Sequence, residues 1–120
     1  MNKKIMIGVV IAIILIVLGI YLIFFSTATG QATSKNNFAK CLSEKGATFY
    51  GAAWCGHCQN QKALFGDSFK YVNYVECTLN AQTCQSAGVM AYPTWIINGQ
   101  KYEGEMTIAF LAKLTECPEP

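Results

Sequence analysis

The sequence is short of charge and contains a single histidine. Charged residues make up only 13% of its 120 residues, and the basic ones are scattered, with no basic stripe and no interleaved aromatic residues. This pattern does not favour a nucleic-acid-binding protein. Internal repeats and low-complexity tracts are also lacking. At 120 residues, the chain has room for one small domain and little else.

No charged residue interrupts the run from Ile5 to Phe25. At about 1.5 Å per residue this run reaches about 30 Å, the thickness of a bilayer hydrocarbon core. Lys3 and Lys4 precede it, so the positive-inside rule predicts a cytoplasmic N-terminus, and Tyr21 suits an interfacial position near the far end. We therefore expect a single-pass anchor in the cytoplasmic membrane, with the C-terminal domain extracytoplasmic.

A cleaved signal peptide is the alternative, with Ala28-Thr29-Gly30 as a small-residue cleavage site. Cleavable signals usually have a shorter apolar region of about 7–15 residues. No cysteine directly follows the run to carry a lipid anchor, and an uncleaved anchor is favoured. The sequence then divides into an anchor over residues 1–25, a flexible linker over 26–36 and a folded domain over 37–117.

Six cysteines in a short exported chain point to an oxidising compartment. Two of them stand in the segment Trp54-Cys55-Gly56-His57-Cys58, which follows an apolar run and precedes a helical pattern. A CxxC in this context is typical of a redox-active pair. Cys55 would lie at a helix N-terminus, where N–H groups and the macrodipole favour a thiolate. Cys55 is therefore the expected nucleophile and Cys58 the resolving thiol.

His57 would add a second stabilising positive charge when protonated; the simpler alternative is a solvated helix residue without a special role. Zinc is a further alternative, since half of a zinc site looks like this pair. Structural zinc usually takes four ligands, often from two CxxC pairs. The only histidine lies inside the first pair, and the remaining cysteines form no second one. We expect a redox site without metal or cofactor.

The rest of the domain shows alternating helical and strand patterns. Their order predicts an α/β fold with a mixed sheet flanked by helices. Helices are expected from Asn36 or Asn37 and at 56–65 and 107–116, a short polar helix or loop at 80–88, and strands at 47–53, 71–75, 94–97 and 100–103. Asn98-Gly99 is a type I′ hairpin signal, and Ala63, Leu64 and Phe65 are expected to pack inward.

Ala91-Tyr92-Pro93-Thr94, just before the third strand, is the second chemical motif. The proline can be an ordinary turn residue. Combined with an upstream CxxC, it favours a cis-proline packed against the disulfide, because cis peptide bonds are almost always X–Pro bonds. The backbone of Tyr92 would then meet an incoming peptide as a strand-like partner. Trp54 and Tyr92 are thus candidate substrate-binding residues, and Pro93 is a candidate catalytic residue.

These motifs together resemble the thioredoxin-fold family, and most closely the thioredoxin-like domain associated with vitamin K epoxide reductase homologues. The resemblance runs from about Phe38 to Leu114 and rests on Phe49-Tyr50-Gly51-Ala52, Trp54-Cys55, His57-Cys58-Gln59, Gln61-Lys62, Leu64-Phe65-Gly66, Tyr74-Val75-Glu76-Cys77 and Tyr92-Pro93-Thr94-Trp95-Ile96-Ile97-Asn98. The Cys-Gly-His-Cys tetrapeptide is also similar to that of protein disulfide isomerases. The resemblance implies that Cys55 and Cys58 are the redox pair and that Pro93 is the cis-proline.

The resemblance also implies a structural disulfide between Cys77 and Cys84. Cys41 and Cys117 then remain, either as a second structural bridge or as two buried apolar thiols. A bridge between them requires Cα atoms within about 7 Å of each other.

Two positions depart from the family pattern. Many thioredoxins carry a buried acid six residues before the first active cysteine, where this chain has Phe49. Glu76 on the neighbouring strand is a possible substitute. Ala63 also stands where thioredoxins often have a helix-kinking proline.

We therefore expect a membrane-anchored thiol–disulfide oxidoreductase that acts on protein thiols or disulfides. Stabilising the Cys55 thiolate makes the disulfide a stronger oxidant, which favours oxidation of substrates over thioredoxin-type reduction. The resemblance implies reoxidation by a membrane partner such as a vitamin K epoxide reductase homologue. With one span and no quinone-binding helical bundle here, that partner would be a separate chain. A non-enzymatic thioredoxin-fold binding module is the remaining alternative, although a scaffold does not need an intact CxxC.

Overall fold

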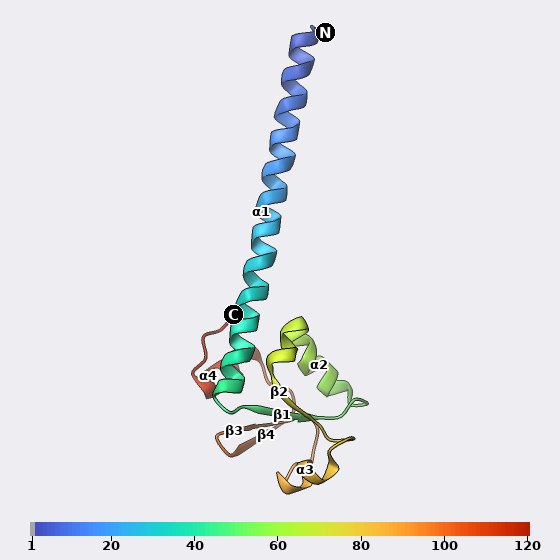
Figure 1. Ribbon diagram of the computed structural model, residues 1–120, viewed down its shortest axis with the longest axis vertical. Coiled ribbons are helices and arrows are strands. Elements are labelled where there is room, and N and C mark those ends of the chain that lie inside the picture. The colour runs from blue at the N-terminus through green and yellow to red at the C-terminus, as the bar shows by residue number, and fades with distance from the viewer. Residues whose placement is uncertain (1) are drawn as a thin grey trace. The chain divides into compact units, whose positions relative to one another are not determined.

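The structure of the chain, a computed structural model, describes residues 2–120, without the side chains of residues 27–32. It divides into two units, Met1–Thr33 and Ser34–Pro120. Helix α1 (Lys3–Glu44) begins in the first unit, and its last turns belong to the second (Figure 1). The division into anchor, linker and domain given above stays a prediction.

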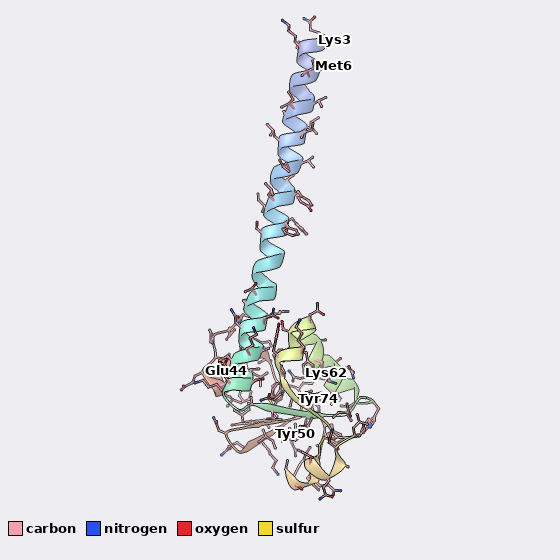
Figure 2. The ribbon with its side chains drawn as sticks, in the orientation of Figure 1. Lys3, Met6, Glu44, Tyr50, Lys62 and Tyr74 are labelled. Carbon is pink, nitrogen blue, oxygen red and sulfur yellow. A yellow bond between two sulfur atoms is a disulfide. The ribbon has the colours of Figure 1, made fainter. Side chains whose placement is uncertain are left out.

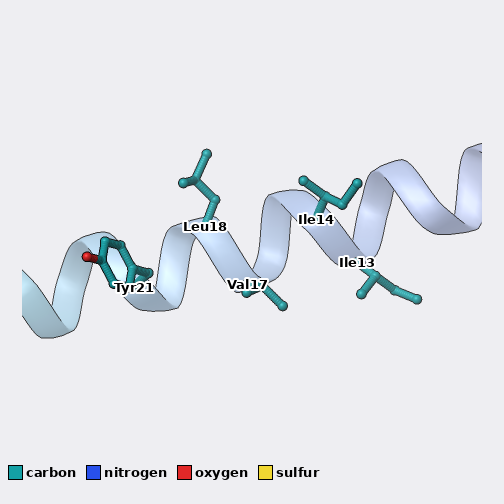
Figure 3. A pocket seen from close by; sticks show the side chains of 5 residues that line it. All are labelled: Ile13, Ile14, Val17, Leu18 and Tyr21. Atoms are coloured by element: carbon teal, nitrogen blue, oxygen red, sulfur yellow. The ribbon is translucent and has the colours of Figure 1, made fainter.

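The first unit contains the apolar part of α1. Its segment Lys3–Ser26 has 24 residues and is long and apolar enough to cross a membrane. The large apolar side chains of this segment are exposed, and Figure 3 shows five of them: Ile13, Ile14, Val17, Leu18 and Tyr21. A helix that is apolar all round is typical of a membrane span, although a signal sequence near the N-terminus has the same character.

The stretch over residues 26–36 differs from the sequence prediction. We expected a flexible tether and a new helix beginning at Asn36 or Asn37, but α1 continues unbroken to Glu44. The stretch contains one glycine and no proline, and its alanine, glutamine and lysine residues are good helix formers. Small polar residues are therefore not enough to end the helix. Phe38 and Leu42 still form the buried face that the sequence predicted.

The second unit is built on a four-stranded sheet in the order β2-β1-β3-β4. The strands are β1 (Thr48–Gly51), β2 (Asn73–Glu76), β3 (Thr94–Ile97) and β4 (Gln100–Glu103). β1 runs parallel to β2 and antiparallel to β3, and β4 is antiparallel to β3. The parallel pair needs a crossover, which α2 (Gly56–Phe65) and the 3-10 helix η1 (Gly66–Tyr71) supply. The predicted mixed sheet flanked by helices is confirmed.

The hairpin between β3 and β4 follows its sequence signal. Asn98 and Gly99 both have positive φ, at 51° and 77°, as the two central residues of a type I′ turn require. Both strands of the hairpin have the predicted bounds. β2 is shifted relative to the prediction and begins at Asn73, because η1 takes up the residues through Tyr71.

Side chains alternate between the two faces of the sheet and form two apolar clusters. On one face Phe49 and Trp95 pack with residues of α1, α2 and α4 (Ile108–Thr115). On the other face Tyr50 and Ile96 pack against a smaller cluster that includes Cys84 on the short helix α3 (Ala81–Ser86). Figure 1 shows α2 and α4 on one side of the strands and α3 on the other. The sheet thus separates a large core from a small one.

Helix α2 turns a different face to the core from the one predicted. Its buried residues are Cys58, Gln61 and Phe65, whereas Ala63 and Leu64 are exposed. Because Cys58 points inward from the first turn, the period of 3.6 residues brings positions three and seven residues later to the same side. The sequence prediction is confirmed for Phe65 and wrong for Ala63 and Leu64, because it followed the apolar residues and left out a buried glutamine.

Candidate active site

Cys55 is the N-cap residue of α2, and its extended backbone joins the end of β1 to the helix. The Cys55 N–H donates to the carbonyl of Ala52 at 3.1 Å, which closes the turn before the helix. The Cys55 Sγ accepts a hydrogen bond from the backbone N–H of Cys58 at 3.2 Å. A sulfur in the N-cap position lies next to the unpaired N–H donors and the positive end of the helix dipole, and both stabilise a thiolate.

Cys58 lies in the first turn of α2 as a free thiol and is 0% exposed, against 6% for Cys55. Burial, reinforced by the hydrogen bond with Cys55, raises the pKa of Cys58 to about 11. The end of β1 comes close to this sulfur, since a Cβ at Gly51 would lie 3.0 Å from the Cys58 Sγ. The two thiols of one pair thus have unlike surroundings: both are buried, but Cys55 lies at the helix end and Cys58 lies deeper in the core.

An aromatic cluster occupies the side of the core next to Cys58. The Phe49 ring lies 4.9 Å from that of Trp95, 5.7 Å from that of Tyr74 and 5.9 Å from that of Phe69, between centroids. The Lys62 ammonium lies over this cluster, with Nζ 4.0 Å from the Tyr74 ring centroid (Figure 2). Position 49, where a buried acid is common in the family, is therefore part of an apolar wall.

Glu76, the possible substitute for that acid, accepts four hydrogen bonds from other groups. One of its oxygens accepts hydrogen bonds from the backbone N–H groups of Ala53 (3.1 Å) and Thr78 (3.2 Å) and from the Thr78 hydroxyl (2.7 Å), and the other accepts from the Tyr74 hydroxyl. Burial raises the pKa of Glu76, but these hydrogen bonds outweigh it and lower the pKa to about 2. Glu76 is therefore ionised, and its hydrogen bond with Ala53 joins β2 to the segment before Trp54.

His57 is 77% exposed in its side chain and pairs with Glu105, with 2.6 Å between Nδ1 and Oε1. The Asn60 amide donates to the same oxygen at 3.1 Å. The hydrogen bonds from His57 and then Asn60 lower the pKa of Glu105, which keeps this carboxylate charged. The charge that His57 carries when protonated is thus opposed by a neighbouring negative charge, which the sequence alone did not indicate.

The buried side chain of Gln61 explains how Glu105 reaches the redox helix. The Gln61 Nε2 donates to the carbonyl of Met106 at 3.0 Å, and its Oε1 accepts from the Met106 N–H at 2.6 Å. This two-way amide pairing fixes the segment between β4 and α4 against α2. Glu105, the residue before Met106, is therefore held beside His57 and Asn60.

The candidate substrate-binding residues lie together. The Trp54 side chain is 72% exposed, and its ring meets that of Tyr92 edge-on at 5.9 Å between centroids. Pro93 follows Tyr92 through a cis peptide bond and is buried. Its carbonyl accepts a hydrogen bond from the Gly104 N–H at 2.8 Å. Trp54 and Tyr92 thus form an apolar surface from two separate loops.

The other four cysteines are joined in two disulfides. Cys77 and Cys84, seven residues apart, have Cα atoms 5.8 Å apart, and Cys41 and Cys117, separated by 76 residues, have Cα atoms 6.0 Å apart. The first bond lies in the small cluster on the α3 face, against which Tyr92 also packs. The second joins the end of α1 to the residue that follows α4 by two positions.

The free cysteines and the histidine are few for a metal site. Within residues 2–120, no group of three or more His, Cys, Asp or Glu side chains is placed to hold a metal ion. Because the disulfides use four cysteines, the described part of the chain offers Cys55 and Cys58 as its free thiols. This arrangement suits thiol–disulfide exchange.

Three residues near the cysteines were not singled out from the sequence: Lys62, Tyr74 and Glu105. The sequence could have indicated Lys62, because it follows Cys58 by about one helical turn. No sequence pattern indicates Glu105, because only the hydrogen bonds of Gln61 with Met106 bring it to α2.

A mixed sheet whose first strand leads into a helix with one cysteine at its N-cap and another in its first turn defines a thioredoxin-fold domain. The family described as Thioredoxin matches residues 30–115, and the chain belongs to this family.

Two kinds of relative are similar to the chain. Thiol-disulfide oxidoreductase LTO1 of Arabidopsis thaliana is 39% identical over 103 residues, which cover 77% of this chain and 27% of that protein. DnaJ homolog subfamily C member 10 of Homo sapiens and of Pongo abelii is 44% identical over 52 residues, which cover 38% of this chain and 6% of those proteins. The chain therefore spans about a quarter of LTO1 and much less of the others.

Proposed function

We propose that the chain is a membrane-anchored, extracytoplasmic thiol–disulfide oxidoreductase that works through Cys55 and Cys58. The observation that carries the proposal is the contrast between the two free thiols. Cys55 caps α2 and accepts the Cys58 N–H on its sulfur, whereas Cys58 is fully buried with a raised pKa. A nucleophile at a helix N-terminus beside a fully buried resolving thiol suits disulfide exchange. The name of the relative LTO1 agrees with this reading.

The direction we propose is oxidation of substrate proteins. A substrate thiolate attacks the Cys55 sulfur of the disulfide, the bond to Cys58 breaks, and the second substrate thiol then releases the substrate as a disulfide. Trp54 and Tyr92 provide an exposed aromatic surface for the substrate polypeptide next to the redox pair. Reduction of substrates runs the same steps backwards and is the alternative direction.

Regeneration of the oxidant needs an electron acceptor. We propose a membrane redox partner on a separate chain, such as a vitamin K epoxide reductase homologue, on the strength of the motifs from Phe49 to Asn98. The helical segment Lys3–Ser26 would hold the domain at the membrane beside that partner. The lysines at its start favour an N-terminus in the cytoplasm and a domain outside it.

The reduction potential of the Cys55–Cys58 pair tests the direction. We would equilibrate the full chain in detergent with glutathione redox buffers and follow the pair by thiol labelling. A value near about −120 to −180 mV indicates an oxidant or isomerase, and one near about −270 mV a reductase. If Cys55→Ser retains full biological activity, a non-enzymatic binding module is the better description, and zinc retained by the purified protein would favour the metal alternative.

The fate of the N-terminal segment tests the anchor. We expect the intact chain in membrane fractions, with Cys55 accessible to a membrane-impermeant thiol reagent added from outside. A mature protein that begins at Gln31 in soluble fractions would mean a cleaved signal peptide instead. Labelling only after the membrane is permeabilised would reverse the proposed orientation.

A further inference from the structure

Disulfide exchange at the proposed site requires the buried Cys58 thiol to lose and regain a proton. Its side chain is 0% exposed, and burial, together with Cys55, raises its pKa to about 11. At neutral pH such a thiol is almost entirely protonated, although the thiolate is the form that attacks or leaves. A group close to Cys58 that stabilises its thiolate therefore favours the exchange.

The groups that act on the pKa of Cys58 are the Cys55 thiol, a backbone hydrogen bond at Ala52, which lowers it, and the charge of Lys62, which also lowers it. Tyr74 interacts with the Cys58 charge in turn and donates a hydrogen bond to Glu76 on β2. Burial, then the hydrogen bond to Glu76 and its charge, raise the pKa of Tyr74 well above the ordinary range, so the phenol stays neutral. Glu76, with its pKa near 2, is a weak base, and its lone pairs are occupied by four hydrogen bonds. Among these groups, Lys62 alone carries a positive charge.

Lys62 is held in place next to Cys58. It follows Cys58 by four residues on α2, so the two side chains share one face of the helix on successive turns. Its Nζ lies 4.0 Å from the Tyr74 ring centroid and 5.4 Å from that of Phe69, and the side chain is half-buried. Within residues 2–120, the ion pair found inside 4.0 Å is His57–Glu105, so Lys62 has no carboxylate partner at that range. The Lys62 ammonium therefore faces the aromatic rings, and its charge lowers the pKa of Cys58, although less than the backbone hydrogen bond at Ala52 does.

We propose that Lys62 is the positioning residue for the resolving thiol: its ammonium, seated over the Tyr74 ring, stabilises the Cys58 thiolate. This inference rests on the proposed exchange function. Many thioredoxins have a buried proton-accepting acid at the position that Phe49 occupies here. In this chain the fixed positive charge of Lys62 would instead make the Cys58 thiolate easier to form.

Both directions of the reaction use this charge. When a mixed disulfide between Cys55 and a substrate is resolved, the Cys58 thiolate attacks the Cys55 sulfur, the new Cys55–Cys58 bond forms, and the electron pair of the broken bond leaves on the substrate sulfur, which takes a proton from water. In the reverse direction Cys58 is the leaving thiolate, and its proton comes from water. Lys62 keeps its own proton throughout.

The test follows the mixed disulfide with glutathione in the full chain. Reduced protein is mixed with glutathione disulfide at pH 7, and the glutathionylated intermediate at Cys55 is quantified after acid quenching. A nearby unit charge is expected to change the thiolate fraction about tenfold at an intermediate effective dielectric constant. Since a more basic thiolate is also more nucleophilic, Lys62→Met should slow resolution about threefold. Lys62→Arg should stay near the wild-type rate.

A second readout separates charge from packing. In a Cys55→Ala background, the pH profile of Cys58 alkylation should move to higher pH in Lys62→Met and not in Lys62→Arg. Lys70→Gln is the matched control, because Lys70 also lies over an aromatic ring, Tyr71 at 5.2 Å, but on η1. An unchanged profile in Lys62→Met refutes the role of Lys62. Failure of the wild-type chain to exchange with glutathione at all would instead refute the proposed function.

Discussion

The ring of His57 and the carboxylate of Glu105 lie 2.6 Å apart, between Nδ1 and Oε1, although 48 positions separate them in the chain. The contact joins the first turn of the redox helix to the segment between β4 and α4. Because the hydrogen bond from His57 lowers the pKa of Glu105, the carboxylate stays charged close to the redox pair. The positive charge of a protonated His57, within the CxxC segment, is therefore opposed by the charge of Glu105.

Removing the negative charge of this pair should make Cys55 more reactive. At mildly acidic pH, Glu105→Gln removes the negative charge that opposes a protonated His57, and we expect alkylation of reduced Cys55 to accelerate about twofold, the size of a screened surface interaction. His57→Gln should have the opposite effect. Iodoacetamide labelling followed by peptide mass spectrometry measures both, and a slower reaction in Glu105→Gln would contradict this account.

The two thiols of the pair should react at very different rates. Cys55 caps the helix, whereas Cys58 is fully buried with a pKa near 11, so at pH 6 we expect Cys55 to be alkylated at least about tenfold faster. Cys58→Ser should accumulate mixed disulfides through Cys55, and Cys55→Ser should form none. Equal labelling of the two cysteines, or preferential labelling of Cys58, would overturn the assignment of the nucleophile.

Acid should remove the contribution of Glu76 to stability. Its folded-state pKa of about 2 lies below the ordinary value of 4.5, so the carboxylate stabilises the fold fully above about pH 4.5, and this contribution is lost as the pH falls towards 2. For a half-buried, well-solvated carboxylate we expect Glu76→Gln to cost about 1 kcal/mol at pH 7. Urea unfolding should show that this difference shrinks towards zero at pH 2.5.

The matched control for Glu76 is Glu103→Gln, because Glu103 lies exposed on β4. Its effect on the free energy of unfolding should be small at both pH values. A Glu76→Gln penalty that stays constant between pH 7 and pH 2.5 would mean that packing of the side chain, and not its charge, is what matters.

The two disulfides should contribute unequally to stability. In the chain-entropy model, closing the loop between Cys41 and Cys117, 76 residues apart, is worth about 4.5 kcal/mol, against about 2.5 kcal/mol for Cys77–Cys84, seven residues apart. We expect the double alanine variant of the long loop to show the larger fall in the unfolding midpoint. Peptide mapping of non-reduced protein tests the pairing itself, and a Cys41–Cys84 or Cys77–Cys117 peptide would refute it.

The local features of this protein follow from the sequence because each depends on residues that are close in the chain. The CxxC spacing, between a strand pattern and a helical pattern, places one thiol at the cap and the other in the first turn of α2. Asn98-Gly99 specifies its turn through the positive φ that both residues tolerate. The charge-free run after Lys4 specifies a long apolar helix. The mixed sheet also followed, since the alternation of helix and strand patterns leaves few arrangements.

The electrostatics of the redox pair depend instead on contacts between distant segments, which no local pattern contains. The Lys62 ammonium lies over the ring of Tyr74, which belongs to β2. Glu105 lies beside His57 because Gln61 is hydrogen-bonded to the backbone of Met106. The continuity of α1 through residues 26–36 was likewise missed, because small polar residues lower helix propensity only slightly. The sequence by itself determined which cysteine pair this protein places at a helix end. Only the tertiary structure decided which charges surround that pair, because electrostatic energies depend on distance in space and not on separation along the chain.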